Sequence, residues 1–103
     1  MIKEFSSVNL DAELQNGVVV LDFWAPWCTN CRMMTPFVEK MATELDGQVN
    51  VIKVNSDENM DLAKQYDVQT LPTLICFKGG AETKRLVGPK PYLKLLNEVK
   101  EIL

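Results

Sequence analysis

Apolar residues recur along the chain with two spacings, and these spacings predict the elements of the fold. Val18–Trp24 is apolar at almost every position, which is typical of a strand covered by helices on both faces. After Cys31, apolar residues recur every three or four positions, which predicts a long helix that ends near Gly47. Further strands are expected over Ile2–Phe5, Val49–Asn55, Pro72–Phe77 and Glu82–Val87, and further helices over Leu10–Gln15, over Asn59–Tyr66 and from Pro91 onward.

Turn and capping residues separate these elements. Asn16-Gly17 ends the first helix, Asn59 is a candidate N-cap, Lys78-Gly79-Gly80 predicts a hairpin, and Pro91 suits the first position of the closing helix. One apolar face of that helix is expected to comprise Tyr92, Leu95, Leu96, Val99 and Leu103. The order βαβαβαββα, without a linker or a repeat, predicts a single domain over residues 1–103 with an α/β fold.

The composition agrees with an ordinary globular domain and narrows its partners. Of 103 residues, 47% are hydrophobic and 24% are charged, and the net charge is -3 without a basic stripe. This balance argues against nucleic acid or an anionic membrane surface as a partner. The longest apolar runs, Val18–Leu21 and Leu74–Phe77, are too short to span a membrane. The first seven residues lack the apolar segment of a signal peptide, so we expect a cytoplasmic protein.

The absence of histidine and the spacing of two cysteines restrict the chemistry. Without histidine, Cys-His and Ser-His nucleophile pairs and His-ligated zinc sites are excluded. Cys28 and Cys31 are one turn apart at the start of a predicted helix, where they can close a small disulfide ring. Free backbone amides and the helix dipole favour a thiolate at Cys28, which is therefore the candidate nucleophile. Arg32 either adds to this preference for an anion or is a solvated side chain.

A metal site is the main alternative use of a Cys-x-x-Cys pair. Such a pair can be half of a zinc site or part of an iron–sulfur site. A four-ligand site needs a second pair, and Cys76 is the only other thiol in the chain. Its apolar neighbours in Leu74–Phe77 predict a small core residue. We therefore expect a redox dithiol and no metal.

Asp22 is the one carboxylate within the apolar strand Val18–Trp24. Burying such a group costs several kcal/mol unless it is partnered or neutralised, which suggests a function. The alternative is a purely structural ion pair with Lys53 on the neighbouring strand.

Several segments resemble the thioredoxin family, and the resemblance covers essentially the whole chain in order. The segments are Val20–Cys28, the helix with Pro36, Val51–Asn55, Leu71–Thr73, Phe77–Gly80 and Val87-Gly88. The resemblance implies a thioredoxin fold, with a central mixed five-stranded sheet flanked by four helices. Thr29 and Asn30 depart from the Gly-Pro that the family usually carries between the two cysteines, which leaves redox potential and substrate range open.

The resemblance also implies roles for particular residues. Cys28 would attack a substrate disulfide and Cys31 would resolve the mixed disulfide, with Cys28 the exposed thiol and Cys31 the protected one. Asp22 would accept the proton of Cys31, through water, with Lys53 as its electrostatic neighbour. Trp24 would pack under the active-site helix.

The same resemblance implies a substrate-docking surface around the dithiol. It would comprise Trp27, Thr29, Asn30, Leu71, Pro72 and Gly88. Pro72 would follow a cis peptide bond, and the backbone before it would pair with an extended substrate by strand addition. Gly88 is alternatively a turn residue.

The function implied is reduction of protein disulfides by a cytoplasmic monomer without a bound cofactor. Electrons would come from a thioredoxin reductase, either NADPH-linked or ferredoxin-linked. Two other functions remain open: a more oxidising exchanger like a glutaredoxin or a disulfide isomerase, suggested by Thr29 and Asn30, and a redox-inactive binding module with the same fold.

Overall fold

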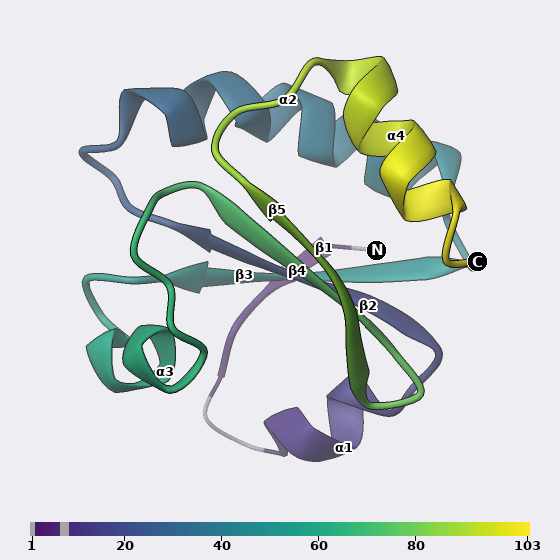
Figure 1. The fold of residues 1–103 in the computed structure, drawn as a ribbon, viewed down its shortest axis with the longest axis horizontal. Coiled ribbons are helices and arrows are strands. Elements are labelled where there is room, and N and C mark those ends of the chain that lie inside the picture. The colour runs from purple at the N-terminus through teal and green to yellow at the C-terminus, as the bar shows by residue number, and fades with distance from the viewer. Residues whose placement is uncertain (1, 7–8) are drawn as a thin grey trace.

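The computed structural model describes residues 2–6 and 9–103 and contains a mixed sheet covered by helices on both faces (Figure 1). In chain order the elements are β1 Ile2–Glu4, α1 Leu10–Leu14, β2 Val18–Trp24, α2 Thr29–Glu44, β3 Val49–Asn55, α3 Met60–Gln65, β4 Thr73–Lys78, β5 Ala81–Val87 and α4 Tyr92–Lys100. The five strands lie in the order β1-β3-β2-β4-β5. β1, β3 and β2 are parallel, β4 is antiparallel to β2, and β5 is antiparallel to β4. This arrangement confirms the predicted α/β class and element order.

Alternate residues of β2 face two different layers. Val18 and Val20 belong to a core shared with α2 and α4, whereas Val19, Leu21 and Phe23 belong to a second core under α1 and α3. Figure 1 shows these two helix pairs on opposite sides of the sheet. Because helices cover both faces of the strand, nearly all of its side chains are apolar.

α2 is the 16-residue helix that begins at the dithiol. Its buried face is formed by Cys31, Met34, Val38, Met41 and Ala42, and Pro36 lies inside the helix as predicted. None of the helices in the described part of the chain is both long and apolar enough to cross a membrane.

One end of the sheet brings four chain segments together. In the strand register, Trp24 pairs with Asn55, Phe23 pairs with Thr73, and Thr73 pairs with Val87. The loops after β2, β3 and β5 and the loop before β4 therefore lie at the same end. In α/β sheets, the ends where parallel strands finish are the usual place for a functional site.

The bounds of the predicted strands and of the two short helices differ from the observed bounds by at most one residue. Three other details of the prediction are wrong. Asn59 lies at the N-cap position of α3, but its side chain accepts no hydrogen bond from the first turn, and its Nδ2 donates to the Asn55 carbonyl (3.0 Å). Pro91 is the N-cap of α4 rather than its first residue. Leu103 lies beyond the end of α4 and is 41% exposed, and Ile102 packs against the core in its place.

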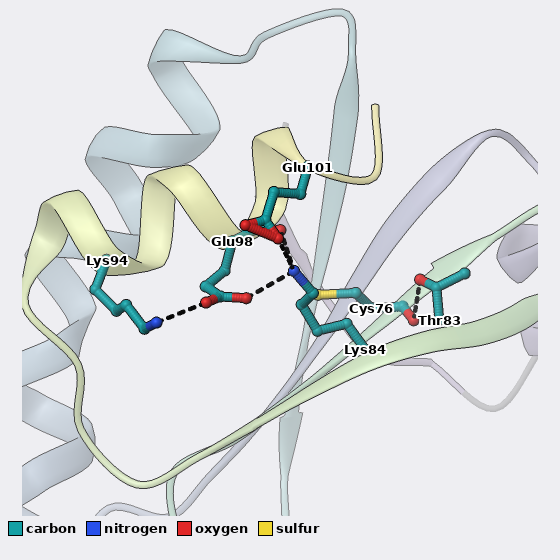
Figure 2. Close-up of polar contacts among 6 residues, drawn as sticks. All are labelled: Cys76, Thr83, Lys84, Lys94, Glu98 and Glu101. Carbon is teal, nitrogen blue, oxygen red and sulfur yellow. Dashed lines mark hydrogen bonds and ion pairs between the residues drawn. The ribbon is translucent and has the colours of Figure 1, made fainter.

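Ion pairs attach β5 to α4 (Figure 2). Lys84 Nζ lies 2.6 Å from Glu98 Oε2 and 2.7 Å from Glu101 Oε2, and Lys94 Nζ lies 2.7 Å from the other oxygen of Glu98. The two ammonium groups hold the pKa of Glu98 at about 2, mainly through hydrogen bonds from Lys84 and then from Lys94. This cluster adds a polar link between β5 and α4, beside the contacts that Leu95, Leu96 and Val99 make in the core.

Candidate active site

The dithiol lies in the first turn of α2, immediately after the loop that follows β2. Cys28 is the N-cap residue, with extended backbone angles (φ -85°, ψ 107°), and it forms a disulfide with Cys31 across a Cα–Cα distance of 5.2 Å. The backbone N–H of Cys31 donates to Cys28 Sγ at 3.1 Å. The sulfur thus occupies the place of an N-capping acceptor, where the exposed amides of a first turn favour negative charge. This geometry agrees with a thiolate at Cys28 in the reduced protein.

The expected difference in exposure between the two cysteines is wrong for this disulfide-bonded form. Cys28 and Cys31 are each 5% exposed. Their positions in the helix distinguish them instead, because Cys28 precedes the first helical residue and Cys31 lies on the buried face of α2.

Arg32 folds back over the turn. Its Nη1 donates to the carbonyl oxygen of Pro26 at 3.2 Å, although the side chain is exposed. No acidic residue lies in the first turn of α2. The nearest fixed charge along the helix is therefore positive, which favours an anion at Cys28.

Asp22 is buried in β2 on the side covered by α2. It is only 5% exposed and pairs in register with Lys53 of β3. Burial raises the pKa of Asp22 to about 6, an effect that the Lys53 ammonium partly offsets and the nearby Glu4 carboxylate adds to. A carboxyl group with this pKa can exchange protons near neutral pH.

Lys53 contacts an aromatic ring rather than the carboxylate. Its Nζ lies 4.8 Å from the centroid of the Trp24 ring, a cation–π distance. Asp22 and Lys53 form no ion pair in the described part of the chain. The alternative of a structural Asp22–Lys53 ion pair is therefore wrong, and Lys53 acts on Asp22 only through its charge.

Trp24 packs against the dithiol, as predicted. Together with Leu71 it contacts the buried cluster of Ala25, Cys28 and Cys31. Its indole Nε1 is buried and has no hydrogen-bond partner among residues 2–6 and 9–103.

Residues expected to dock substrate surround the dithiol. Trp27 is 66% exposed, and its Nε1 donates to Asp57 Oδ1 at 3.2 Å. Thr29 and Asn30 form the exposed start of α2 between the cysteines. Leu71 packs against the cysteine cluster and is joined to Pro72 by a cis peptide bond.

Gly88 approaches this surface from β5. Its N–H donates to the Pro72 carbonyl at 2.8 Å, and its φ of +83° favours glycine. A Cβ at this position would meet no atom within 4 Å. Backbone conformation, rather than crowding, therefore explains why glycine occupies this position. Gly88 is a turn residue and is also hydrogen-bonded to Pro72.

A groove beside Trp27 is a feature that the sequence does not predict. It has a volume of about 630 Å³ and lies between the Trp27 loop and α3. Its lining comprises Trp27, Ser56, Asp57, Met60, Asp61, Ala63, Lys64, Asp67, Val68, Gln69 and Leu71. The one available signal in the sequence is Met60, a large apolar residue at the polar start of a short helix.

Cys76 belongs to the core, as predicted. It is a fully buried free cysteine in β4, and burial raises the pKa of its thiol to about 11. Figure 2 shows it beneath the Lys84 cluster, and Thr83 Oγ1 donates to its carbonyl at 3.1 Å. In the described residues, no three Cys, Asp or Glu side chains gather to hold a metal ion.

Comparisons with known proteins agree with this geometry. A sequence model of the family named Thioredoxin matches residues 1–101. A thioredoxin of Chlamydia pneumoniae is 45% identical over 101 residues, which cover 98% of each chain. A thioredoxin of Synechocystis is 43% identical over 94 residues, covering 91% of this chain and 85% of that protein. A thioredoxin of Staphylococcus saprophyticus is 37% identical over 102 residues, covering 99% of this chain and 98% of that protein. Because the match spans nearly the whole chain and a disulfide-forming Cys-x-x-Cys pair lies at the start of α2, the chain belongs to the thioredoxin family and is a thiol–disulfide oxidoreductase.

Proposed function

We propose that the chain reduces protein disulfides, with Cys28 as the attacking residue and Cys31 as the resolving one. The Cys28 thiolate bonds to one sulfur of the substrate disulfide and expels the other as a thiolate, which takes up a proton. Cys31 then loses its proton and attacks Cys28 Sγ. The mixed disulfide breaks, and the second substrate sulfur leaves as a thiolate. Two electrons pass to the substrate, and a Cys28–Cys31 disulfide remains.

One observation carries this order of events: the Cys31 N–H donates to Cys28 Sγ at the N-cap of α2. Such a donor stabilises negative charge on Cys28 before the attack. Cys31 is the third residue of α2 and lies on its buried face, which suits a thiol that reacts only with its neighbour.

Asp22 is the proposed acceptor for the Cys31 proton, through a bridging water. Its position on the α2 side of β2 and its pKa of about 6 support this role. At pH 7 about nine-tenths of such carboxyl groups are ionised and can accept a proton. Lys53 assists by its charge, which keeps the pKa of Asp22 from rising further.

The proposed docking surface comprises Trp27, Thr29, Asn30, Leu71, Pro72 and Gly88. Within the described residues, neither the N–H nor the C=O of Leu71 has a hydrogen-bond partner, because β4 begins only at Thr73. An extended substrate can therefore pair with this backbone by strand addition.

Thr29 and Asn30 favour a second candidate function, that of a more oxidising exchanger. Both are exposed at the start of α2, next to Cys28. Asn30 supplies an N–H that proline lacks, and Thr29 supplies a hydroxyl. Donors of this kind stabilise a thiolate more than a disulfide sulfur, which would make the protein a weaker reductant than Gly-Pro members of the family.

The proposed setting is electron transport that maintains redox homeostasis in the cytoplasm. Members of this family generally work with a thioredoxin reductase and disulfide-containing substrates, and the reducing reaction needs such a donor. We propose that the chain acts as a monomer and holds no cofactor of its own, because Cys28 and Cys31 carry both electrons. Parallel assays with NADPH-linked, ferredoxin-linked and glutathione-linked donors identify the donor, and sedimentation and cell fractionation test the monomer and the compartment.

Dithiothreitol-driven reduction of insulin disulfides tests the function and the order of attack. Cys28→Ser should abolish catalysis, and Cys31→Ser should accumulate a mixed disulfide through Cys28 that mass spectrometry detects. Cys76→Ala is the matched control and should retain activity, because Cys76 is buried in the core. A trapped partner on Cys76, or an active Cys28→Ser variant, would show that the assignment is wrong.

A further inference from the structure

We propose that the groove beside Trp27 selects substrates that carry Lys or Arg next to the reactive cysteine. This inference rests on the proposed reduction of protein disulfides and adds a preference among substrates. The groove is the Trp27–α3 hollow of about 630 Å³ described above.

The groove is continuous with the dithiol. Leu71 lines the groove and also packs against the cluster that contains Cys28 and Cys31. Trp27, the residue before Cys28, forms part of the groove wall and is 66% exposed. A polypeptide bonded to Cys28 therefore has its neighbouring residues at the mouth of this groove.

The walls combine apolar surface with an excess of carboxylates. Met60 is 72% exposed and lines the groove together with Trp27. Three carboxylates line it, from Asp57, Asp61 and Asp67, against the single ammonium of Lys64, so its net charge is -2. The stem of a Lys or Arg side chain can lie on the apolar walls while its charged end meets the carboxylates.

Asp61 is the carboxylate most available to a substrate. Asp57 accepts a hydrogen bond from the Trp27 indole, and Asp67 accepts one from Gln69 Nε2 at 2.9 Å. Asp61 is exposed in the first turn of α3, and its carboxylate forms no hydrogen bond or ion pair with any residue of 2–6 and 9–103.

The negative charge is local to this side of the dithiol. On the α2 side, the charged residues near the site are cationic: Arg32 in the first turn of α2, and Lys90 in a small hollow that Met33 and Pro89 also line. The preference therefore follows from the groove and not from the overall charge of the chain, which is only -3. A substrate with acidic neighbours would meet repulsion on the groove side.

The test compares disulfide-linked dimers of Gly-X-Cys-X-Gly peptides in which X is Lys, Gln or Glu. Reduced protein is mixed with each peptide, the reaction is quenched with acid and alkylated, and mass spectrometry gives the second-order rate constant. Each constant is divided by that for dithiothreitol, because a Lys neighbour makes a disulfide intrinsically more reactive toward any thiolate. At about 0.1 M salt we expect the normalised rate for Lys to exceed that for Glu by about fivefold, and the ratio to approach one at about 1 M salt.

Variants locate the preference in the groove. Asp61→Asn should lower the Lys-to-Glu ratio by about twofold or more, and Asp61→Lys should lower it further. Glu39→Gln is the matched control: it removes one exposed negative charge from α2, where Glu39 lines a different hollow with Ala42 and Asp46, and should leave the ratio unchanged.

The outcomes separate this inference from the proposed function. Equal normalised rates for the Lys and Glu peptides, or equal effects of Asp61→Asn and Glu39→Gln, overturn the groove preference while the reductase function stands. Failure to reduce even the neutral Gln peptide and insulin overturns the reductase function and the preference with it.

Discussion

Replacing Asp22 by Asn should remove the loss of folding stability that ionisation of Asp22 causes as pH rises to about 6, and should slow resolution of the mixed disulfide. Asn has nearly the same shape as Asp but cannot ionise or accept the Cys31 proton. The substitution therefore tests both consequences of burying this carboxyl group under α2.

The pKa of Asp22 sets the size of the effect on stability. In the unfolded chain the pKa is 3.8, and in the folded protein it is about 6 because burial disfavours the charged form. Below pH 3.8 the group is protonated in both states and costs nothing. Between pH 3.8 and about 6 the unfolded chain ionises while the folded protein stays protonated, so stability falls, and above 6 the loss is complete. The rise from 3.8 to about 6 corresponds to about 3 kcal/mol of folding stability lost between about pH 4 and about pH 7.

Urea unfolding of the oxidised protein at several pH values measures this loss. The variant minus wild-type difference in unfolding free energy should grow by about 3 kcal/mol from about pH 3.5 to about pH 7.5. The change in this difference is the useful quantity, because a constant cost of burying the amide of the variant cancels between the two pH values. Rapid mixing gives the second measurement, the rate at which Cys31 resolves the mixed disulfide. Near pH 7 this rate should fall by a factor whose upper guide is about 10²–10⁴, while the rate of attack by Cys28 is nearly unchanged.

Two results would contradict these expectations for Asp22, one for its titration and one for its role as a base. A difference in unfolding free energy that stays constant across the pH range would show that Asp22 titrates alike in both states. Equal resolution rates for the two proteins near neutral pH would show that Asp22 does not accept the Cys31 proton, even if the stability result holds.

Three further predictions concern other parts of the molecule. We expect a reduction potential of about -240 to -210 mV for this chain in a glutathione redox buffer, against the reference of about -270 mV for thioredoxin. A potential of this chain at or below that reference would contradict the argument that Thr29 and Asn30 act as donors to the Cys28 thiolate. Replacing Thr29-Asn30 by Gly-Pro should lower the potential. Gly88→Ala should destabilise the protein by about 1–3 kcal/mol in urea unfolding, because φ is +83° there, and an unchanged midpoint would contradict it. Glu98→Gln should destabilise the protein at about pH 6 but not near pH 2. The pKa of Glu98 is lowered from 4.5 to about 2, so the stability from its ion pairs is lost as pH falls through that interval. An effect on urea unfolding that does not change with pH would contradict this prediction.

Local patterns in the sequence predict most of the fold and the centre of the site. The apolar strand Val18–Trp24 and the helical spacing after Cys31 specify β2 and α2. The Cys-x-x-Cys pair and the single carboxylate in an apolar strand identify the dithiol and Asp22. In each case the signal lies within one segment, so it can be recognised without tertiary contacts.

Features that need distant segments could not be predicted in the same way. The groove joins Trp27 after β2 to Met60 in α3 and Leu71 before β4, and no spacing in the sequence relates these residues. The position of the Lys53 ammonium over the Trp24 ring depends on the register of β2 and β3 and on side-chain conformation. The burial of Ile102 in place of Leu103 could not be predicted because both are apolar, and packing alone decides which one is covered.

The burial of Asp22 links the stability of this protein to its chemistry. An exposed carboxyl group with a pKa of 3.8 would be ionised at neutral pH but would be a weak base toward a thiol. Burial brings its pKa to about 6, closer to that of a cysteine, while most of the population stays ionised near neutral pH. The Lys53 charge limits the rise, because a much higher pKa would leave the group protonated and unable to accept a proton. The cost in folding stability and the usefulness of Asp22 as a base therefore have the same physical cause, and a substitution that removes one should remove the other.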